Sequence, residues 1–284
     1  MKTQAGGSRA LLWWIGIPLL LMVLWNFLAS RNPVYSSERM LWHAQIASLR
    51  ILKDPASVPP VAVEKTLAGL QEIIRRYPKS NPAARAQLFI GQIHAVRKEF
   101  PAAHEALELV LTDYSNRTLH VINAYRAIAG TYLLEKSWQK ALETYRTLLS
   151  KFPEDPRVID VPQLMVGVAR PNAPDAGESV LREAIEHYHV VISKCKPGST
   201  LYLVAQQRLA GCYLLAGRWK EAAQVYETLV MTYFNRPEVR YWMKNVEELG
   251  KRRLEDPSRA HVLALQFAEQ HPNRRYLVEP WLKQ

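Results

Sequence analysis

Residues 128–148 read IAGTYLLEKSWQKALETYRTL, and this stretch decides the fold. An apolar residue is followed by a small one and, three positions later, by a ring. Nine residues after the ring comes a second small residue, with large apolar residues four and seven positions further on. The members of this pattern are Ile128, Ala129, Tyr132, Ala141, Tyr145 and Leu148. Spacings of three, four and seven place side chains on one face of an α-helix, so the stretch predicts two closely packed helices.

The pattern recurs along the chain at nearly regular intervals. Two further full copies are Ile90, Gly91, His94, Ala103, Leu107, Val110 and Leu209, Ala210, Tyr213, Ala222, Tyr226, Leu229. The second-helix half occurs three more times, with small residues at Thr66, Ala184 and Ala260. The six small positions are spaced by 37, 38, 43, 38 and 38 residues. This periodicity predicts an array of stacked helix pairs.

The pattern resembles the tetratricopeptide (TPR) repeat, whose minimal unit is about 34 residues. Slightly longer units like these are similar to those of the TPR assembly factors of bacterial outer membranes, including the lipoprotein of the β-barrel assembly machinery. The resemblance covers residues 36–272 and implies an all-α solenoid of about six helix pairs that binds other proteins. That family is lipidated at a cysteine, whereas this chain has no cysteine before Cys195.

The same periodicity predicts where the helices lie. We expect them at 37–53, 61–77, 82–98, 101–114, 118–135, 138–151, 178–195, 199–216, 219–233, 237–254 and 258–271, with Ser36 or Ser37 as the first N-cap. The irregular stretch Glu154–Gly177 contains four prolines and interrupts the array. We expect a short helix at Val161–Arg170 there, followed by an exposed loop, Pro171–Gly177. The loop is either a partner-binding element or an insertion.

The N-terminus carries a long apolar run, Ala10–Ala29, without a charged residue. Twenty residues are enough to cross a hydrocarbon core of about 30 Å. Trp13, Trp14 and Trp25 lie near its two ends, where indoles favour membrane interfaces. The run predicts a transmembrane helix; a cleaved signal peptide is the alternative. A short basic tail favours an N-in orientation. The sequence therefore predicts a single-pass membrane protein whose repeats are periplasmic or otherwise extracytoplasmic.

These predictions divide the chain into five parts. They are a basic tail (1–9), an anchor (10–29), a linker (30–35), the solenoid (36–272, with its insertion at 154–177) and a C-terminal tail (273–284).

The net charge is +11, and the basic residues are spread thinly over the chain. No run reaches five basic residues, so a nucleic-acid partner is not expected. A basic surface is instead compatible with an acidic protein or peptide.

Motifs of catalysis are missing from the sequence. It contains no G-x-x-x-x-G-K-[S/T], G-x-G-x-x-G, G-x-S-x-G or H-E-x-x-H, so we expect no enzyme, cofactor or metal site. His187 and His189 are two residues apart on a predicted helix and cannot share a metal face. Cys195 and Cys212 are either free thiols or a disulfide.

In TPR arrays the first helices of successive units line a concave groove that holds peptides. The resemblance carries this role to Arg85, Gln92, Asn123, Arg126 and Gln207. Arginine forks and amides suit the carboxylates and backbone of a peptide, although the same positions also fit an ordinary polar surface.

Three functions are compatible with the sequence. The first is a membrane-tethered adaptor that binds proteins, in envelope protein assembly among other roles. The alternative is a carrier that holds a lipid, glycan or other small ligand in its concave face, which needs a large apolar pocket. An enzyme is the third, and it lacks a recognisable set of reactive groups.

Overall fold

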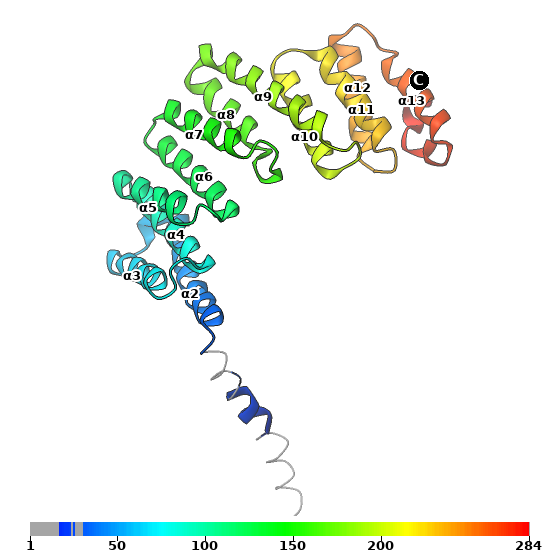
Figure 1. Ribbon diagram of the computed structural model, residues 1–284. Coiled ribbons are helices and arrows are strands. Elements are labelled where there is room, and N and C mark those ends of the chain that lie inside the picture. Colours follow the sequence, from blue (N-terminus) through cyan, green and yellow to red (C-terminus); the bar gives the residue numbers. More distant parts are fainter. Residues whose placement is uncertain (1–16, 24, 26–30, 284) are drawn as a thin grey trace, which may run out of the picture. The chain divides into compact units, whose positions relative to one another are not determined.

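The computed structural model describes residues 17–23, 25 and 31–283, and every regular element in these residues is helical. The chain divides into two compact units, Met1–Ser137 and Trp138–Gln284. The elements of the N-terminal unit are α2 (Pro33–Lys53), η1 (Pro55–Ser57), α3 (Pro60–Arg76), α4 (Asn81–Val96), α5 (Phe100–Asp113) and α6 (Thr118–Leu134) (Figure 1).

The C-terminal unit continues the series of helices joined by short turns. Its elements are α7 (Trp138–Lys151), η2 (Pro156–Val158), α8 (Val161–Asn172), α9 (Pro174–Lys194), α10 (Thr200–Leu215), α11 (Trp219–Thr232), α12 (Val239–Arg253), α13 (Arg259–Gln270), η3 (Pro272–Leu277) and α14 (Glu279–Leu282). In both units, the helices that pack extensively on each other are one or two places apart along the chain. The predicted all-α, TPR-like architecture of helix pairs is thereby confirmed.

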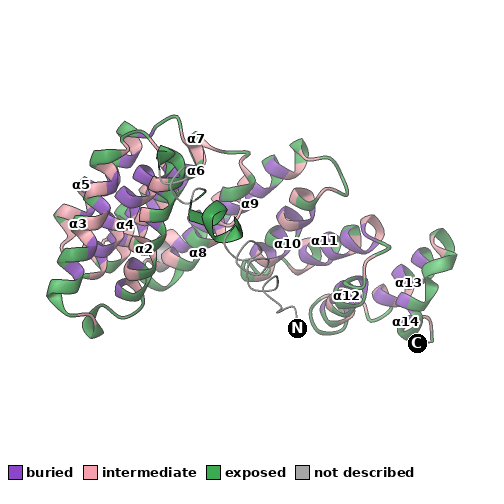
Figure 2. Ribbon diagram, turned by 90° about the horizontal axis from the view of Figure 1, so that it is seen from below, coloured by how far each residue is buried: buried purple, intermediate pink, exposed green. Residues whose placement is uncertain are grey.

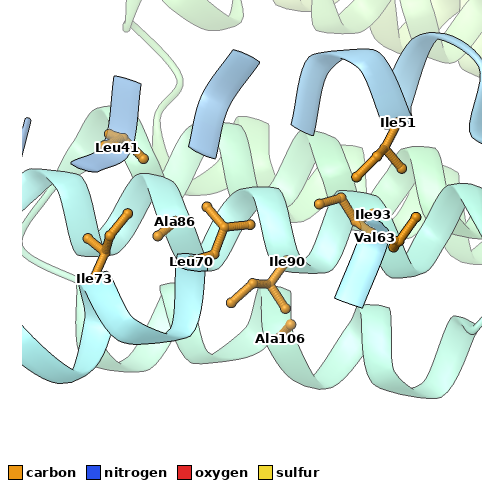
Figure 3. Packing of buried hydrophobic residues seen from close by; sticks show 9 residues of the cluster. All are labelled: Leu41, Ile51, Val63, Leu70, Ile73, Ala86, Ile90, Ile93 and Ala106. Carbon is orange, nitrogen blue, oxygen red and sulfur yellow. The ribbon is translucent and has the colours of Figure 1, made fainter. Parts of the chain in front are cut away.

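Buried residues lie on the helix faces that are turned toward neighbouring helices, as the colouring of the ribbon in Figure 2 shows. In the N-terminal unit one cluster joins four helices, from α2 to α5, through Leu41, Ile51, Val63, Leu70, Ile73, Ala86, Ile90, Ile93 and Ala106 (Figure 3). Full burial of one such aliphatic side chain stabilises the fold by about 1.5–3 kcal/mol. The array is therefore held together by side chains shared between successive helices.

The six small positions of the repeat lie in the interior, as the periodicity predicts. All six residues are buried, and the five alanines among them are almost completely inaccessible to solvent. The six are Thr66, Ala103, Ala141, Ala184, Ala222 and Ala260. Gly91 on α4 also lies at a close approach, because a Cβ at this position would lie 2.5 Å from Cγ of Leu107 on α5. A side chain larger than hydrogen therefore does not fit between α4 and α5 at this point.

The turn inside a helix pair has the same geometry in three repeats. Lys98, Lys136 and Gly217 adopt positive φ angles of 64°, 61° and 69°, each four residues after the ring position. The residue after each of them donates its backbone N–H to the carbonyl of the ring residue: Glu99 to His94 (2.9 Å), Ser137 to Tyr132 (2.8 Å) and Arg218 to Tyr213 (2.9 Å). This is a Schellman-type end, in which a left-handed residue satisfies the last carbonyls of a helix.

Several predicted boundaries differ from the structure. The first long helix begins at Pro33 rather than after Ser36, because the side chain of Asn32 accepts a hydrogen bond from Val34 N (2.9 Å) and caps it. Proline is favourable at the first helical position, since it has no N–H to leave unpaired. Residues after 272 form η3 and α14 instead of a tail, and Trp281 is buried against the unit.

The stretch 154–177 is mostly helical. Helix α8 covers Val161–Asn172 and includes Pro171, and α9 begins at Pro174. The expected exposed loop Pro171–Gly177 is therefore reduced to Ala173 between two helices. Gly177 makes this possible, because its Cα lies so close to α8 that a Cβ would be 3.3 Å from Cα of Arg170.

The predicted membrane helix needs a correction. Most of Ala10–Ala29, with Trp13 and Trp14, lies outside the described residues, whereas Trp25 is described and exposed. Within residues 17–23, 25 and 31–283, no helix has the length and apolar character that crossing a membrane requires. This finding contradicts the predicted single-pass localisation with its N-in orientation and extracytoplasmic repeats.

Candidate functional site

The first helices of the repeats in the N-terminal unit lie side by side, with α4 between α2 and α6. We call the surface formed by α2, α4 and α6 the first-helix surface. Four of the five residues predicted to bind a peptide belong to it: Arg85 and Gln92 on α4, and Asn123 and Arg126 on α6. The fifth, Gln207, is exposed on α10 and therefore belongs to the other unit.

Arg85 occupies the centre of the first-helix surface. Its Nη2 donates a hydrogen bond to Oε1 of Gln45, and its Nη1 lies 3.7 Å from Oε2 of Glu38, both on α2. Arg85 is only half-buried, and Glu38 is well exposed, so the ion pair remains in contact with water. Such a pair contributes little to stability and can be exchanged for another carboxylate.

A buried histidine lies near Arg85. The pKa of His120 on α6 is lowered, first because burial disfavours the charged imidazole and then because Arg117 and Arg85 are close. Its Nδ1 has no hydrogen-bond partner among the described residues. The neutral ring therefore adds no positive charge of its own to the surface at neutral pH.

Apolar area accompanies these polar groups on α2. Trp42 is 62% exposed, and it shares a helix face with Glu38 and Gln45, because the three are spaced by four and three residues. Asn123 is exposed, while Gln92 and Arg126 are half-buried, and Arg126 has an interaction partner of its own. The first-helix surface thus combines an exposed indole with a guanidinium and amides, a composition typical of protein-binding surfaces.

Histidine–carboxylate pairs were missed by the sequence analysis. His104 on α5 contacts Glu135 after α6, with Nε2 and Oε1 2.6 Å apart, and its ring lies 4.3 Å from that of Tyr132. Because the sequence separation is 31 residues, no local pattern indicates this contact. Nδ1 of His94 likewise lies 2.6 Å from Oε2 of Glu99. The pKa of Glu99 is lowered by this hydrogen bond first and then by Arg97.

The described residues offer few groups for other chemistry. No cluster of three or more His, Cys, Asp or Glu side chains in them is arranged to hold a metal ion. Cys195 and Cys212 are free thiols. Burial raises the pKa of Cys212 to about 11, so this thiol is protonated and unreactive at neutral pH.

Comparison with known proteins identifies several solved structures that are similar to this chain. The chain is similar to a putative kinesin light chain of Podosopora anserina with nearly identical TPR-like repeats (16% identity, TM-score 0.43, 68% of this chain and 93% of that one). It is also similar to PilF of Pseudomonas aeruginosa (14% identity, TM-score 0.42, 86% and 99%). A third similar structure is a human IFIT1 dimer with m7Gppp-AAAA (18% identity, TM-score 0.43, 84% and 51%). No protein-family model and no curated protein matches the chain.

Proposed function

We propose that this chain is a scaffold that binds protein partners on the first-helix surface of its N-terminal unit. The observation that carries the proposal is the arrangement around Arg85, where an exchangeable ion pair lies beside the exposed Trp42. Tryptophan and arginine are the residues that most often dominate the free energy of protein binding. A partner carboxylate would replace Glu38 at the guanidinium, and an apolar side chain of the partner would cover the indole.

An acidic peptide segment is the partner that fits this surface. Arg85 and Arg126 supply the charge, and Gln92 and Asn123 supply donors and acceptors for a peptide backbone. Gln207 would take part only in a separate contact on the C-terminal unit. The sequence resemblance to outer-membrane assembly factors makes envelope proteins the first partners to test.

The carrier function receives less support from the structure. Hollows of about 450, 660 and 410 Å³ occur on the described surface, and each has charged as well as apolar side chains in its lining. A lipid carrier needs a predominantly apolar cavity that buries most of its ligand. The exposed indole and guanidinium of the first-helix surface fit a protein partner better.

Site-specific crosslinking tests the proposal. A photoreactive residue at Asn123, which is exposed on α6, should crosslink the full chain to a defined partner in an extract of its source. The same residue at Val61, which is exposed on α3 outside the surface, is the matched control. Equal crosslinking from both positions would contradict the proposed surface.

Variants of the surface then test its chemistry. Trp42→Ala and the double variant Arg85→Ala, Arg126→Ala should each weaken the binding of that partner by about tenfold or more, because each removes a central contact. Val61→Ala should leave binding unchanged. Circular dichroism checks that every variant is folded. Undiminished binding by folded variants would refute the proposed function.

A further inference from the structure

One of the three hollows, in the C-terminal unit, has the features of a ligand site. It has a volume of about 450 Å³ and lies where the ends of α8 and α10 meet the first half of α9. Leu181 and Ile185 form its apolar floor and are buried, and Leu215 is a 45% exposed side chain in its lining. We call it the arginine hollow, after the side chains of its rim.

Among the described side chains, three arginines and one glutamate line the rim: Arg170, Arg182, Arg218 and Glu178. Arg218 is already engaged, because it pairs with Glu221 at 2.8 Å and its guanidinium lies 4.6 Å from the centre of the Tyr213 ring. Among the ion pairs of the described residues, none involves Arg170 or Arg182. Glu178 stands one helical turn before Arg182 without pairing to it. Two guanidinium groups that pair with no described carboxylate thus border an apolar floor.

This combination selects the chemistry of a ligand. A guanidinium presents parallel N–H donors that match the two oxygens of a carboxylate. The apolar floor suits an aliphatic side chain that is close to this carboxylate. Because the arginines and Leu215 are exposed, the hollow is too open to bury a long alkyl chain, and its volume is at the low end for ligand sites. The end of a peptide, whose remaining residues stay in water, fits these conditions.

We propose that the arginine hollow binds a protein C-terminus that ends in an aliphatic residue. The α-carboxylate lies between Arg170 and Arg182, and the last side chain contacts Leu181, Ile185 and Leu215. Glu178 disfavours acidic residues just before the C-terminus of the peptide, because its carboxylate repels them. The hollow is formed by second as well as first helices of the C-terminal unit, and it is independent of the first-helix surface.

The test uses the full chain and a fluorescent pentapeptide, Ser-Gly-Ser-Gly-Leu, with a free C-terminus. Fluorescence polarisation should show saturable binding that weakens by about tenfold or more for the C-terminally amidated peptide, which lacks the charge. A peptide that ends in serine should also bind more weakly, because it loses the contact with the floor. Equal binding of the free and amidated peptides would overturn the proposal, as would an absence of saturable binding.

Variants of the chain assign the binding to this hollow. The double variant Arg170→Ala, Arg182→Ala should weaken binding of the free peptide by about tenfold or more, and Glu178→Gln should tighten it. The control, Arg252→Ala, Arg275→Ala, removes two exposed arginines elsewhere in the same unit and should stay within about twofold of the wild type. Equal losses in both double variants would show diffuse charge attraction and refute the site.

Two further measurements keep the outcome unambiguous. Arg182→Lys retains the positive charge but loses the parallel N–H donors of the guanidinium. It should therefore weaken binding while the circular dichroism spectrum is unchanged. Octanoate, an aliphatic carboxylate without a peptide, should compete only at concentrations well above those of the free peptide. Competition by octanoate at equal or lower concentrations would overturn the peptide assignment in favour of a fatty acid.

Discussion

The turn between the two helices of a repeat depends on a single left-handed residue. Of the three turn residues, Gly217 adopts the left-handed conformation without steric cost, because glycine has no Cβ. Lys98 and Lys136 adopt the same conformation although each has a Cβ. The cost for an ordinary L-residue is about 1–2 kcal/mol. The two lysine turns are therefore strained, and the surrounding helices keep them in place.

Exchanging the residues of these turns should change stability in opposite directions. Lys136→Gly should raise the free energy of unfolding by about 0.5–1 kcal/mol, because strain is removed at some cost in chain entropy. Gly217→Ala should lower it by about 1 kcal/mol; its Cβ would meet only Trp219, at an ordinary 3.8 Å, so strain alone is measured. Urea denaturation gives both values. A destabilised Lys136→Gly variant would contradict this account.

The two cysteines should differ in reactivity. Cys212 is buried with a pKa of about 11, whereas Cys195 is partly accessible and its pKa is raised less strongly, by burial first and by Glu154 second. Alkylation of the native chain at about pH 8 should therefore modify Cys195 much faster than Cys212. Peptide mass analysis follows both sites. In urea the two rates should become equal, and equal rates in the native protein would contradict the burial of Cys212.

At the scale of the elements, Gly91 on α4 and Gly130 on α6 test how closely neighbouring helices pack, because only the first lies against another helix. Gly91→Ala should destabilise the protein by about 1–3 kcal/mol, because its methyl group would overlap Leu107 and force α4 away from α5. Gly130→Ala on α6 meets no atom within 4 Å and should instead stabilise by about 0.5–1 kcal/mol through helix propensity. Denaturation midpoints of the two variants provide the measurement. If Gly91→Ala were no less stable than Gly130→Ala, the close approach of α4 and α5 would be refuted.

The repeat positions show how far sequence reasoning reaches. The small residues and the helix pairs could be predicted from their spacing, because each helix pair of a regular array needs a small side chain at the same position. Pro171 shows where this reasoning stops, since proline normally ends a helix but stands inside the last turn of α8. The arginine hollow was not foreseeable either. Arg170 and Arg182 come from different helices, and their common position depends on the close approach at Gly177.

The first-helix surface was predictable only in part. Family resemblance indicates the helices that form it, but it does not indicate that Arg85 pairs with Gln45 and Glu38, some 40 residues earlier in the chain. Trp42 carries no distinguishing local signal, because an exposed and a buried tryptophan look alike in sequence. Its role emerges from the side chains that share its face on α2.

At the scale of the whole molecule, stability should fall in mild acid. The pKa values of His120 and His187 are lowered in the folded chain, mainly by burial, relative to about 6.5 in an unfolded chain. Below this value the unfolded state binds more protons, so the free energy of unfolding decreases as the pH falls. The stabilising contribution is complete above about pH 6.5 and is lost as the pH drops through the folded pKa values.

Urea denaturation at about pH 7.5 and pH 5.5 measures this loss. The double variant His120→Asn, His187→Asn should show a smaller difference between the two pH values than the wild type. His43→Asn, an exposed position on α2, is the control and should retain the difference. A double variant with the full wild-type difference would contradict the assignment to these two histidines.

The preference of each helix for partners one or two places away has a kinetic consequence. Contacts between residues close in sequence need little loop closure, and chains dominated by them fold rapidly. In such arrays, each repeat is stabilised by its neighbours, and folding can start in any of them and spread. Among the described helices, α2 packs extensively only on elements that follow it, and α14 only on one that precedes it, so hydrogen exchange in these two is expected to be faster than in α4 or α10.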